Sequence, residues 1–333
     1  MTTMLYYQSV KIMSNMINQN QKLNPKLLKD DIEQAPTRFG YGDGLVIAGK
    51  ENPNVVALCA DLTDSTRTSE FKKEFQDRFV EVGIGEQNMA SLVPFISSYA
   101  MFSPGRNWEQ IRTTICYNNQ NVKIAGAHSG VSVGPDGATH QAIEDMAITR
   151  VIPNMVVIAP CDAIEAKKAT IAAARYKGPV YIRFTREKTP VMTTEETSFE
   201  IGKAEVFREG KDVTIIACGP LLYEALKAAE ELAKEGIEAE VINNHTIKPM
   251  DKETILQSVK KTDCVVTIEE HQAAGGMGSA ISEILSQNYP VPMEIIGVKD
   301  RFGESGEPNE LLEKFGLTAK NIIESAKKAI KRK

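Results

Sequence analysis

Short apolar runs rich in β-branched residues alternate with amphipathic stretches along most of the chain from Val55 onward. The runs that predict strands in the first part of the chain are Val55–Ala60, Phe79–Val82, Pro94–Ser98, Val122–Ala127, Met155–Ala159 and Val180–Phe184. The stretches that predict helices between them are Arg106–Tyr117, Gln141–Arg150 and Ala163–Tyr176. Strands that alternate with helices indicate a mostly parallel sheet with helices on both faces.

A second alternating set follows a polar, turn-rich stretch that begins after Thr185. Its strands are expected at Val213–Cys218, Ala239–Ile242, Cys264–Ile268 and Met293–Ile296, and its helices at Leu221–Lys234, Asp251–Lys260, Met277–Gln287 and, as a basic terminal helix, Ala319–Lys333. The sequence therefore predicts an α/β protein with two doubly wound, mostly parallel-sheet domains, of which the second is smaller. The expected boundaries are a loose N-terminal tail over residues 1–24, a first domain over 25–190, a linker over 191–210 and a second domain over 211–333.

The connection between the strands predicted at Phe79–Val82 and Pro94–Ser98 is unusually short. A crossover between parallel strands needs about a dozen residues or more, including its helix. Only residues 83–93 are available here, and two of them are Gly83 and Gly85. The pattern indicates that this connection lacks a normal helix or that a segment is missing from the chain.

Composition and charge exclude some kinds of partner. The chain is 42% hydrophobic and 25% charged, and its formal net charge is −5 at pH 7. A negatively charged chain has no general affinity for nucleic acid or for an acidic membrane surface. No apolar run is long enough to span a bilayer. The N-terminus lacks the charged-then-apolar order of a secretory signal. We expect a cytoplasmic protein, whose first residues form a loose tail or precede a true start at Met13 or Met16.

The five cysteines predict neither a metal site nor a disulfide framework. No C-x-x-C pair occurs among them, and an odd number argues against a closed set of disulfides. We expect buried, reduced thiols and no metal bound by this chain. The positions are Cys59, Cys116, Cys161, Cys218 and Cys264.

The first candidate for chemistry is Glu86, in the segment VEVGIGEQNMA. A strand there ends in glycines, and the carboxylate then opens a helix. Ligands bind at this edge of open parallel sheets, so the position suits a catalytic or binding carboxylate. A glutamate that merely interacts with the helix dipole is the alternative.

The second candidate segment, AGAHSGVSVGPDGATHQAIED, holds two of the four histidines of the chain. His128 follows a predicted strand, Asp136 lies in a glycine-rich loop, and His140 precedes the next helix. A glycine-rich turn permits close approach of the backbone to a ligand. Two imidazoles and a carboxylate suggest a polar substrate site. A metal set, which would fit no common zinc spacing, and a structural histidine are the alternatives.

Basic and glycine-rich segments add weaker signals. Arg38, Arg183 and Arg186 flank predicted element ends, where arginines can bind a phosphate through directed hydrogen bonds. Surface ion pairs are the alternative for each of them. The GDG tripeptide at 42–44 is predicted to lie in a helix and not in a cofactor loop. The GGMG segment at 275–278 lacks the Lys-Ser/Thr of a phosphate loop and indicates close helix–sheet packing.

Taken in order, these segments resemble the pyrimidine-binding and C-terminal domains of transketolase from about Asn24 to the end of the chain. The residues that carry the resemblance are PTRFGYGDGL, CADLTDSTRT, GIGEQNM, SSYAMF, AHSGVSVGPDGATHQ, FTR and TIKPMD. Full-length transketolases have a preceding domain that binds magnesium and the diphosphate. The chain therefore resembles the separate C-terminal subunit of a split transketolase.

The resemblance implies thiamine diphosphate as cofactor and assigns four residues to it. Glu86 matches the glutamate that contacts N1′ of the aminopyrimidine and exchanges a proton with it. Tyr99 and Phe102 match the aromatic wall around the pyrimidine, and Asp61 matches a residue of the cofactor pocket. Magnesium would be held mainly by the partner subunit, and the cofactor would carry the carbanion chemistry.

The resemblance also assigns substrate residues. His128 and His140 match histidines that contact the reacting oxygens, and Asp136 matches the carboxylate that reads the C2 hydroxyl of the acceptor sugar. The residues that match the sugar-phosphate clamp are Arg38, Ser65, His128 and Arg186. The implied reaction, within the pentose phosphate pathway, transfers a two-carbon ketol unit from a ketose phosphate to an aldose phosphate. The implied partners are an N-terminal transketolase subunit and a second copy of this chain, in a two-fold heterotetramer.

Two departures from the family pattern keep other functions open. Roughly ten residues, or nearly three helical turns, are missing after GEQNMA, and Gly105 replaces a third wall aromatic. The alternatives are a 1-deoxyxylulose-5-phosphate synthase, a 2-oxoacid dehydrogenase β subunit and a non-catalytic regulatory subunit. AHSG at His128 argues against the first, the phosphate-clamp match fits the second less well, and the shortened helix favours the third.

Overall fold

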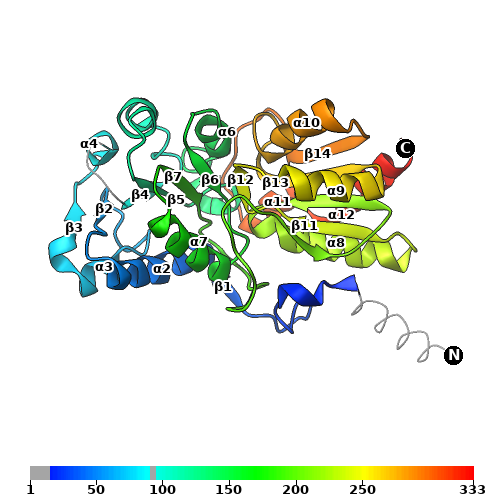
Figure 1. Ribbon diagram of the computed structural model, residues 1–333, viewed down its shortest axis with the longest axis horizontal. Helices are drawn as coiled ribbons and strands as arrows, with labels where there is room; N and C mark the ends of the chain where they lie inside the picture. Colours follow the sequence, from blue (N-terminus) through cyan, green and yellow to red (C-terminus); the bar gives the residue numbers. More distant parts are fainter. Residues whose placement is uncertain (1–15, 91–94) are drawn as a thin grey trace.

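The computed structural model describes residues 16–90 and 95–333, which form two neighbouring α/β units (Figure 1). The first sheet has the strand order β12-β6-β7-β5-β4-β2-β3, and every pairing in it is parallel except that of β12. Its strands are β2 (Ala57–Cys59), β3 (Phe79–Glu81), β4 (Phe95–Tyr99), β5 (Lys123–Ala127), β6 (Val156–Ile158), β7 (Val180–Arg183) and β12 (Thr246–Lys248).

Helices and shorter turns connect the strands of the first unit. Its α-helices are α2 (Thr37–Glu51), α3 (Ser69–Glu74), α4 (Glu86–Ala90), α5 (Trp108–Gln110), α6 (Asp145–Arg150) and α7 (Ala163–Arg175). The π-helix η3 (Ile111–Tyr117) continues α5, and the 3-10 turns of this unit are η2 (Gln76–Arg78) and η4 (Val131–Asp136). The 3-10 turn η1 (Gln19–Gln21) instead contacts strand β9 (Glu205–Arg208) of the second unit. The short strands β1 (Gln34–Pro36) and β8 (Lys188–Pro190) pair antiparallel beside this unit.

The second sheet has the order β14-β13-β10-β11-β9, in which only β9 is antiparallel to its neighbour. Its strands are β9 (Glu205–Arg208), β10 (Val213–Ala217), β11 (Ala239–Asn243), β13 (Val265–Gln272) and β14 (Met293–Val298). Its helices are η5 (Gly219–Leu221), α8 (Leu222–Lys234), α9 (Lys252–Thr262), α10 (Met277–Asn288), α11 (Pro308–Lys314) and α12 (Ala319–Ile330). The predicted α/β class with two mostly parallel sheets is confirmed.

Burial on both faces explains why the strands read as continuous apolar runs. Every residue of β5, β10 and β11 is buried. A parallel sheet is covered by helices on each side, so its strands need no polar alternation. The five cysteines are also buried and unpaired, as expected from the sequence.

Helix α2 contains the GDG tripeptide, which is helical as predicted. A Cβ on Gly40 would lie 1.8 Å from the carbonyl oxygen of Ala163, and one on Gly44 would lie 2.8 Å from that of Lys167. Both contacts are with α7, so the glycines allow the two helices to approach closely. Packing between helices therefore accounts for this motif.

The short connection between β3 and β4 passes over β2, which pairs with both strands. Its helix α4 is described over Glu86–Ala90, up to the point where the described residues stop. Residues 91–94, at the end of this connection, lie outside the described residues.

The structure differs from the sequence prediction at the N-terminal tail and at the linker. Residues 16–24 were expected to be loose, yet the backbone N–H of Asn18 donates to the oxygen of Phe207 at 3.0 Å, and that of Asn24 donates to Met192 at 2.8 Å. Strand β9 lies inside the expected linker and pairs with β11. A polar segment of this kind gains its order from the edge strand that it contacts, which local pattern does not reveal.

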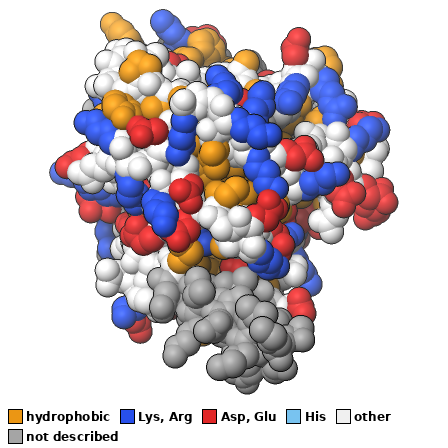
Figure 2. Space-filling view, turned by 90° about the vertical axis from the view of Figure 1, so that its right-hand side faces the viewer, with side chains coloured by type: hydrophobic (Ala, Val, Ile, Leu, Met, Phe, Trp, Pro, Cys, Tyr) orange, Lys and Arg blue, Asp and Glu red, His pale blue; other side chains and the backbone are white. Residues whose placement is uncertain are grey.

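The face formed by the second unit carries a mixture of basic side chains (Lys and Arg) and acidic side chains (Asp and Glu) (Figure 2). The basic terminal helix α12 is part of this mixture, because Lys327 pairs with Glu235 at 2.6 Å and Lys328 pairs with Glu294 at 2.8 Å. Its positive charge is therefore largely balanced within the same unit. No helix among the described residues is both long enough and apolar enough to cross a membrane.

Candidate functional site

The carboxyl ends of β4, β5 and β7 bring most of the predicted site residues to one edge of the first sheet. Tyr99 is the last residue of β4, His128 follows β5 directly, and Arg186 lies just beyond β7. Tyr99 of β4 is in register with Ala127 of β5. The Tyr99 ring therefore lies beside His128, the residue that follows Ala127. This edge is where open parallel sheets bind ligands.

His128 is buried and forms a hydrogen bond with Arg38, which lies in the first turn of α2. The Arg38 Nη1 donates to His128 Nε2 at 2.9 Å and to the carbonyl oxygen of Ser65 at 2.9 Å. A guanidinium only donates, so Nε2 accepts and the imidazole proton lies on Nδ1. That Nδ1 is buried without a hydrogen-bond partner among the described residues. It is a donor that a ligand oxygen could pair.

The surroundings of His128 disfavour its charged form. Burial, followed by the charges of Arg38 and Arg186, lowers the pKa of His128 to about 3. Its backbone φ is 54°, in the left-handed region that residues other than glycine adopt rarely. Such conformations cost of order 1–3 kcal/mol and cluster at functional sites. The histidine is thus held neutral and in a fixed orientation.

Aromatic rings join both histidines to the predicted cofactor wall. The ring of Tyr99 stacks on that of His128 with centroids 4.1 Å apart, and on that of Phe102 at 5.8 Å. The edge of His140 meets Phe102 at 5.3 Å. The wall and the two histidines are therefore one continuous cluster.

Glu86 is 4% exposed and lies beside this cluster. Its carboxylate accepts a hydrogen bond from Ser98 Oγ at 3.1 Å and pairs with Arg106 at 3.4 Å. The Arg106 guanidinium also lies 4.1 Å from the centre of the Phe102 ring. Asn107 donates to the Glu86 carbonyl at 3.2 Å. The carboxylate is fixed in place, and Arg106 connects it to the aromatic wall.

Asp136 and Arg186 bind each other at the open side of the site. The Arg186 Nη1 donates to Asp136 Oδ1 at 3.1 Å and to the carbonyl oxygen of Val133 at 3.0 Å. Each of the two side chains is about one-third exposed, with 33% for Arg186 and 32% for Asp136. Burial and then the charge of Arg186 lower the pKa of Arg38. Arg186 also pairs with Glu187 at 3.7 Å, so an anion at Arg38 would add to a site in which two carboxylates already contact Arg186.

Asp61 is the predicted residue that the structure keeps apart from the cluster. It is exposed after β2, and its backbone N–H donates to Glu81 Oε1 at 2.6 Å. Within residues 16–90 and 95–333, its side chain has no hydrogen bond or ion pair with the other predicted residues. Its φ of 58° again lies in the left-handed region.

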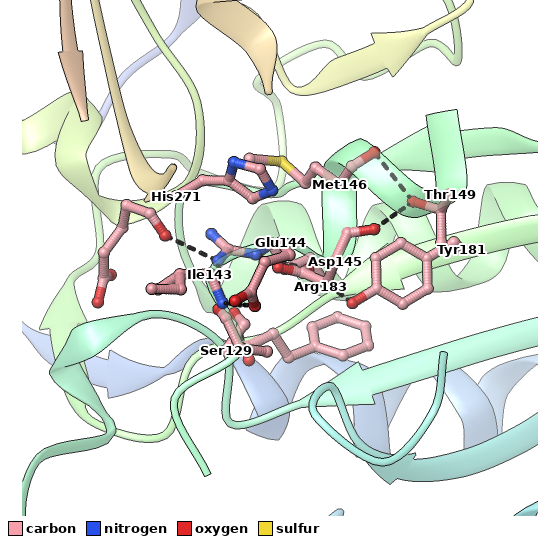
Figure 3. A network of polar contacts seen from close by, with 12 residues as sticks. Ser129, Ile143, Glu144, Asp145, Met146, Thr149, Tyr181, Arg183 and His271 are labelled. Carbon is pink, nitrogen blue, oxygen red and sulfur yellow. Dashed lines mark hydrogen bonds and ion pairs between the residues drawn. The ribbon is translucent and has the colours of Figure 1, made fainter. Parts of the chain in front are cut away.

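Arg183 does not join the other arginines but belongs to a buried network (Figure 3). Its Nε donates to Asp145 Oδ2 at 2.9 Å, and Tyr181 donates to the same oxygen at 2.7 Å. Its Nη2 donates to the carbonyl oxygens of Ala142 at 3.2 Å and Glu270 at 2.8 Å. Arg183 therefore ties the first sheet to strand β13 of the second.

The backbone N–H groups of the GGMG segment bind a carboxylate of the protein itself. Glu269, which is fully buried, accepts from the backbone N–H groups of Met277 at 2.7 Å and Gly278 at 2.8 Å. A Cβ on Gly276 would lie 2.2 Å from Glu269 Oε2. The glycines serve the close helix–sheet packing that the sequence predicted, and the anion site at this helix end is filled from within.

Sequence reasoning missed several residues of the site, of which Ser98, Arg106 and Asn107 contact Glu86. No motif singles them out, although Ser98 is adjacent to Tyr99 and the other two follow Gly105. Among the described residues no group of three His, Cys, Asp or Glu could hold a metal ion.

Comparison with known proteins identifies both halves of the chain. The family described as transketolase, pyrimidine-binding domain, matches residues 33–192, and the family described as transketolase, C-terminal domain, matches residues 202–322. The chain is 46% identical over 307 residues to the "Putative transketolase C-terminal section" of Methanocaldococcus jannaschii, with 87% of this chain and 96% of that protein covered.

Two further relatives are similar along nearly the whole chain. The 6-deoxy-6-sulfo-D-fructose transketolase subunit SqwH of a Clostridium species is 40% identical over 311 residues, which cover 91% of this chain and 97% of that protein. A solved structure described as a split gene transketolase, inactive β4 tetramer, superimposes with a TM-score of 0.82 at 44% identity. That match covers 90% of this chain and all of the other.

Proposed function

The chain belongs to the transketolase family, and we propose that it is the C-terminal subunit of a split transketolase. The proposed reaction transfers a two-carbon ketol unit from a ketose phosphate to an aldose phosphate. The observation that carries this proposal is the buried Glu86 beside the stacked rings of Tyr99 and Phe102, with His128 and His140 on the same wall.

The residues present fit thiamine diphosphate. Glu86 offers a buried carboxylate, and Tyr99 and Phe102 offer flat surfaces on which an aminopyrimidine can stack. These three residues would hold the pyrimidine end, with Asp61 nearer the rim. When bound, the cofactor supplies the carbanion chemistry. The diphosphate and its magnesium would be held mainly by the partner subunit, which corresponds to the preceding domain of full-length transketolases.

The proposed substrate residues have distinct tasks. Arg38 and Arg186, with His128 and the Ser65 segment, would bind the sugar phosphate. His128 and His140 would contact the reacting oxygens, and Asp136 would accept a hydrogen bond from the C2 hydroxyl of the acceptor. Binding the distant phosphate orients the reacting carbonyl and so contributes to the rate.

We propose that the active form is a two-fold heterotetramer with a separate N-terminal subunit, located in the cytoplasm and serving the pentose phosphate pathway. The solved relative described as an inactive β4 tetramer supports the need for a second kind of chain. The five buried, unpaired thiols are compatible with a reducing compartment.

A non-catalytic subunit is the second candidate, and one observation favours it. Only residues 82–94 connect β3 to β4, which leaves little room for a crossover helix after Glu86. A regulatory subunit would keep the fold and the partner interface but would not support transfer. Titration calorimetry with thiamine diphosphate in the presence of the partner discriminates, because absence of cofactor binding supports this candidate.

The deciding experiment measures ketol transfer from xylulose 5-phosphate to ribose 5-phosphate with thiamine diphosphate, magnesium and the N-terminal subunit from the same genome. Activity in the mixture, and not with either chain alone, is expected. A mixture that forms a complex but transfers nothing contradicts the proposal. A sulfonated ketose is a useful second donor, because the SqwH relative is named for such a sugar and guanidinium groups bind both anions.

A further inference from the structure

The loop between His128 and His140 carries much of the proposed substrate site but has little regular structure of its own. It runs through η4 and contains Gly130 and Gly134, whose φ angles are 83° and 81°. Both conformations suit glycine. Apart from the bridge between Ser129 and Ala142, the loop has no strand pairing along its described residues. The position of this loop must therefore be set by the groups that contact its backbone.

Glu270, from β13 of the second unit, contacts this backbone directly. Its Oε1 accepts a hydrogen bond from the Ser132 N–H at 2.5 Å, and a Cβ on Gly130 would lie 2.3 Å from the same oxygen. The Glu270 side chain is buried, at 4% exposure. Its own carbonyl accepts from Arg183, whose positive charge compensates the carboxylate. Figure 3 shows the part of this network around Arg183 and Asp145.

Gln141 provides a second attachment next to His140. Its Nε2 lies within hydrogen-bond distance of three carbonyl oxygens, those of Val131 at 3.0 Å, Gly134 at 3.2 Å and Glu304 at 2.9 Å. Glu304 belongs to the second unit, so the loop is again tied across the boundary between the units. Helix α11, which follows, also packs against η4.

We infer that Glu270 is a positioning residue, through which the second unit fixes the loop that presents His128 and Asp136 to the substrate; this inference deepens the proposed function and rests on it. Glu270 lies 138 residues from Ser132 in sequence, so it acts only in the folded protein. Its carboxylate touches the backbone of the loop and not the reacting groups. Its expected effect is therefore on substrate binding and orientation.

The chain supplies a matched control in the neighbouring Glu269. This side chain is equally buried and also accepts backbone N–H bonds, but from the start of α10, away from the loop. Glu269→Ala should therefore cost stability as Glu270→Ala does, without moving the loop. Both variants are assayed in the complex with the N-terminal subunit, below the temperature at which either unfolds.

Glu270→Ala is expected to lower kcat/KM for ketol transfer about 5- to 150-fold, mainly by raising KM for the acceptor sugar. The estimate follows because an unpaired buried N–H costs about 1–3 kcal/mol and each 1.4 kcal/mol is a factor of ten. Glu270→Gln should retain most of the wild-type value, since its amide oxygen still accepts from Ser132. Glu269→Ala should stay within about threefold of wild type.

Hydrogen exchange of residues 129–136 gives a reading that is independent of catalysis. Exchange of these amides should be faster in Glu270→Ala and unchanged in Glu269→Ala and Glu270→Gln. If Glu270→Ala does not fold, Glu270→Asp, which keeps the charge but withdraws the acceptor, should fold and show the same pattern to a smaller extent.

Three results would overturn the inference. They are a KM in Glu270→Ala no different from that of Glu269→Ala, an equal loss in Glu270→Gln and Glu270→Ala, and faster loop exchange without any kinetic change. Inactive wild-type complex would instead refute the proposed function. In that case the exchange experiment still decides whether Glu270 holds the loop.

Discussion

Replacing Asp145 with asparagine removes one charge of a buried ion pair while nearly preserving the size of the side chain. Asp145 and Arg183 are 1% and 5% exposed, and their atoms lie 2.9 Å apart. Breaking a buried pair by removing one partner costs about 3–5 kcal/mol, because the remaining charge is left uncompensated. The Glu270 carboxylate remains near Arg183. We therefore expect a loss at the lower end, about 3 kcal/mol of unfolding free energy.

The matched control is Glu283→Gln, which makes the same chemical change in a pair whose carboxylate lies at the surface, although Arg150 is 15% exposed. Glu283 is 58% exposed and pairs with Arg150 at 2.5 Å. Exposed pairs contribute roughly 0–1 kcal/mol, because water and salt screen them. The difference of about 2 kcal/mol or more between the two variants is the quantity predicted from burial.

The assay is urea unfolding, with tryptophan fluorescence as the signal that reports the unfolded fraction. Trp108 is the single tryptophan of the chain, and its Nε1 donates to the Ile148 carbonyl at 2.7 Å on α6, the helix that Asp145 begins. The signal therefore reports on the unit that contains the ion pair. If Asp145→Asn destabilises the protein no more than Glu283→Gln does, the reasoning from burial is refuted.

Three further predictions concern the site. Glu86→Ala should leave assembly with the partner intact but abolish ketol transfer. Unchanged turnover would contradict the proposed catalytic role of this carboxylate. Arg186→Ala should chiefly raise KM for phosphorylated sugars, whereas an equal loss with unphosphorylated substrates would argue against a phosphate clamp. His128 has a pKa of about 3 when folded and an ordinary value near 6.5, so the unfolded chain binds the extra proton and stability should fall as pH drops below about 6.5. His128→Gln should reduce that slope in urea unfolding by up to about 1.4 kcal/mol per pH unit, and an unaltered slope would contradict the buried, neutral state.

The location of the site could be predicted in part because it depends on local rules. Alternating apolar runs specify a parallel sheet, and a parallel sheet places the residues that follow its strands on one edge. His128 after β5 and Tyr99 at the end of β4 are such residues. The short connection after β3 was also readable, since chain length limits any crossover.

The partners of these residues could not be read from the sequence. Arg106 against Glu86, Asp136 against Arg186 and Glu270 against Ser132 all join side chains or backbone groups that are distant in the chain. Their contacts depend on rotamers and on how the loops fold back over the sheet edge. Periodicity carries no information about either.

The sequence by itself determined the two parallel α/β units and the residue types at their strand ends, because hydrophobic periodicity and strand direction act over short stretches of chain. Only the tertiary structure decided that β12 extends the first sheet from within the second half of the chain, and that Glu270 reaches the loop after His128. The physical reason is that docking of the two units is governed by complementary surfaces and buried charge pairs. Those are properties of the folded surfaces and not of any local segment.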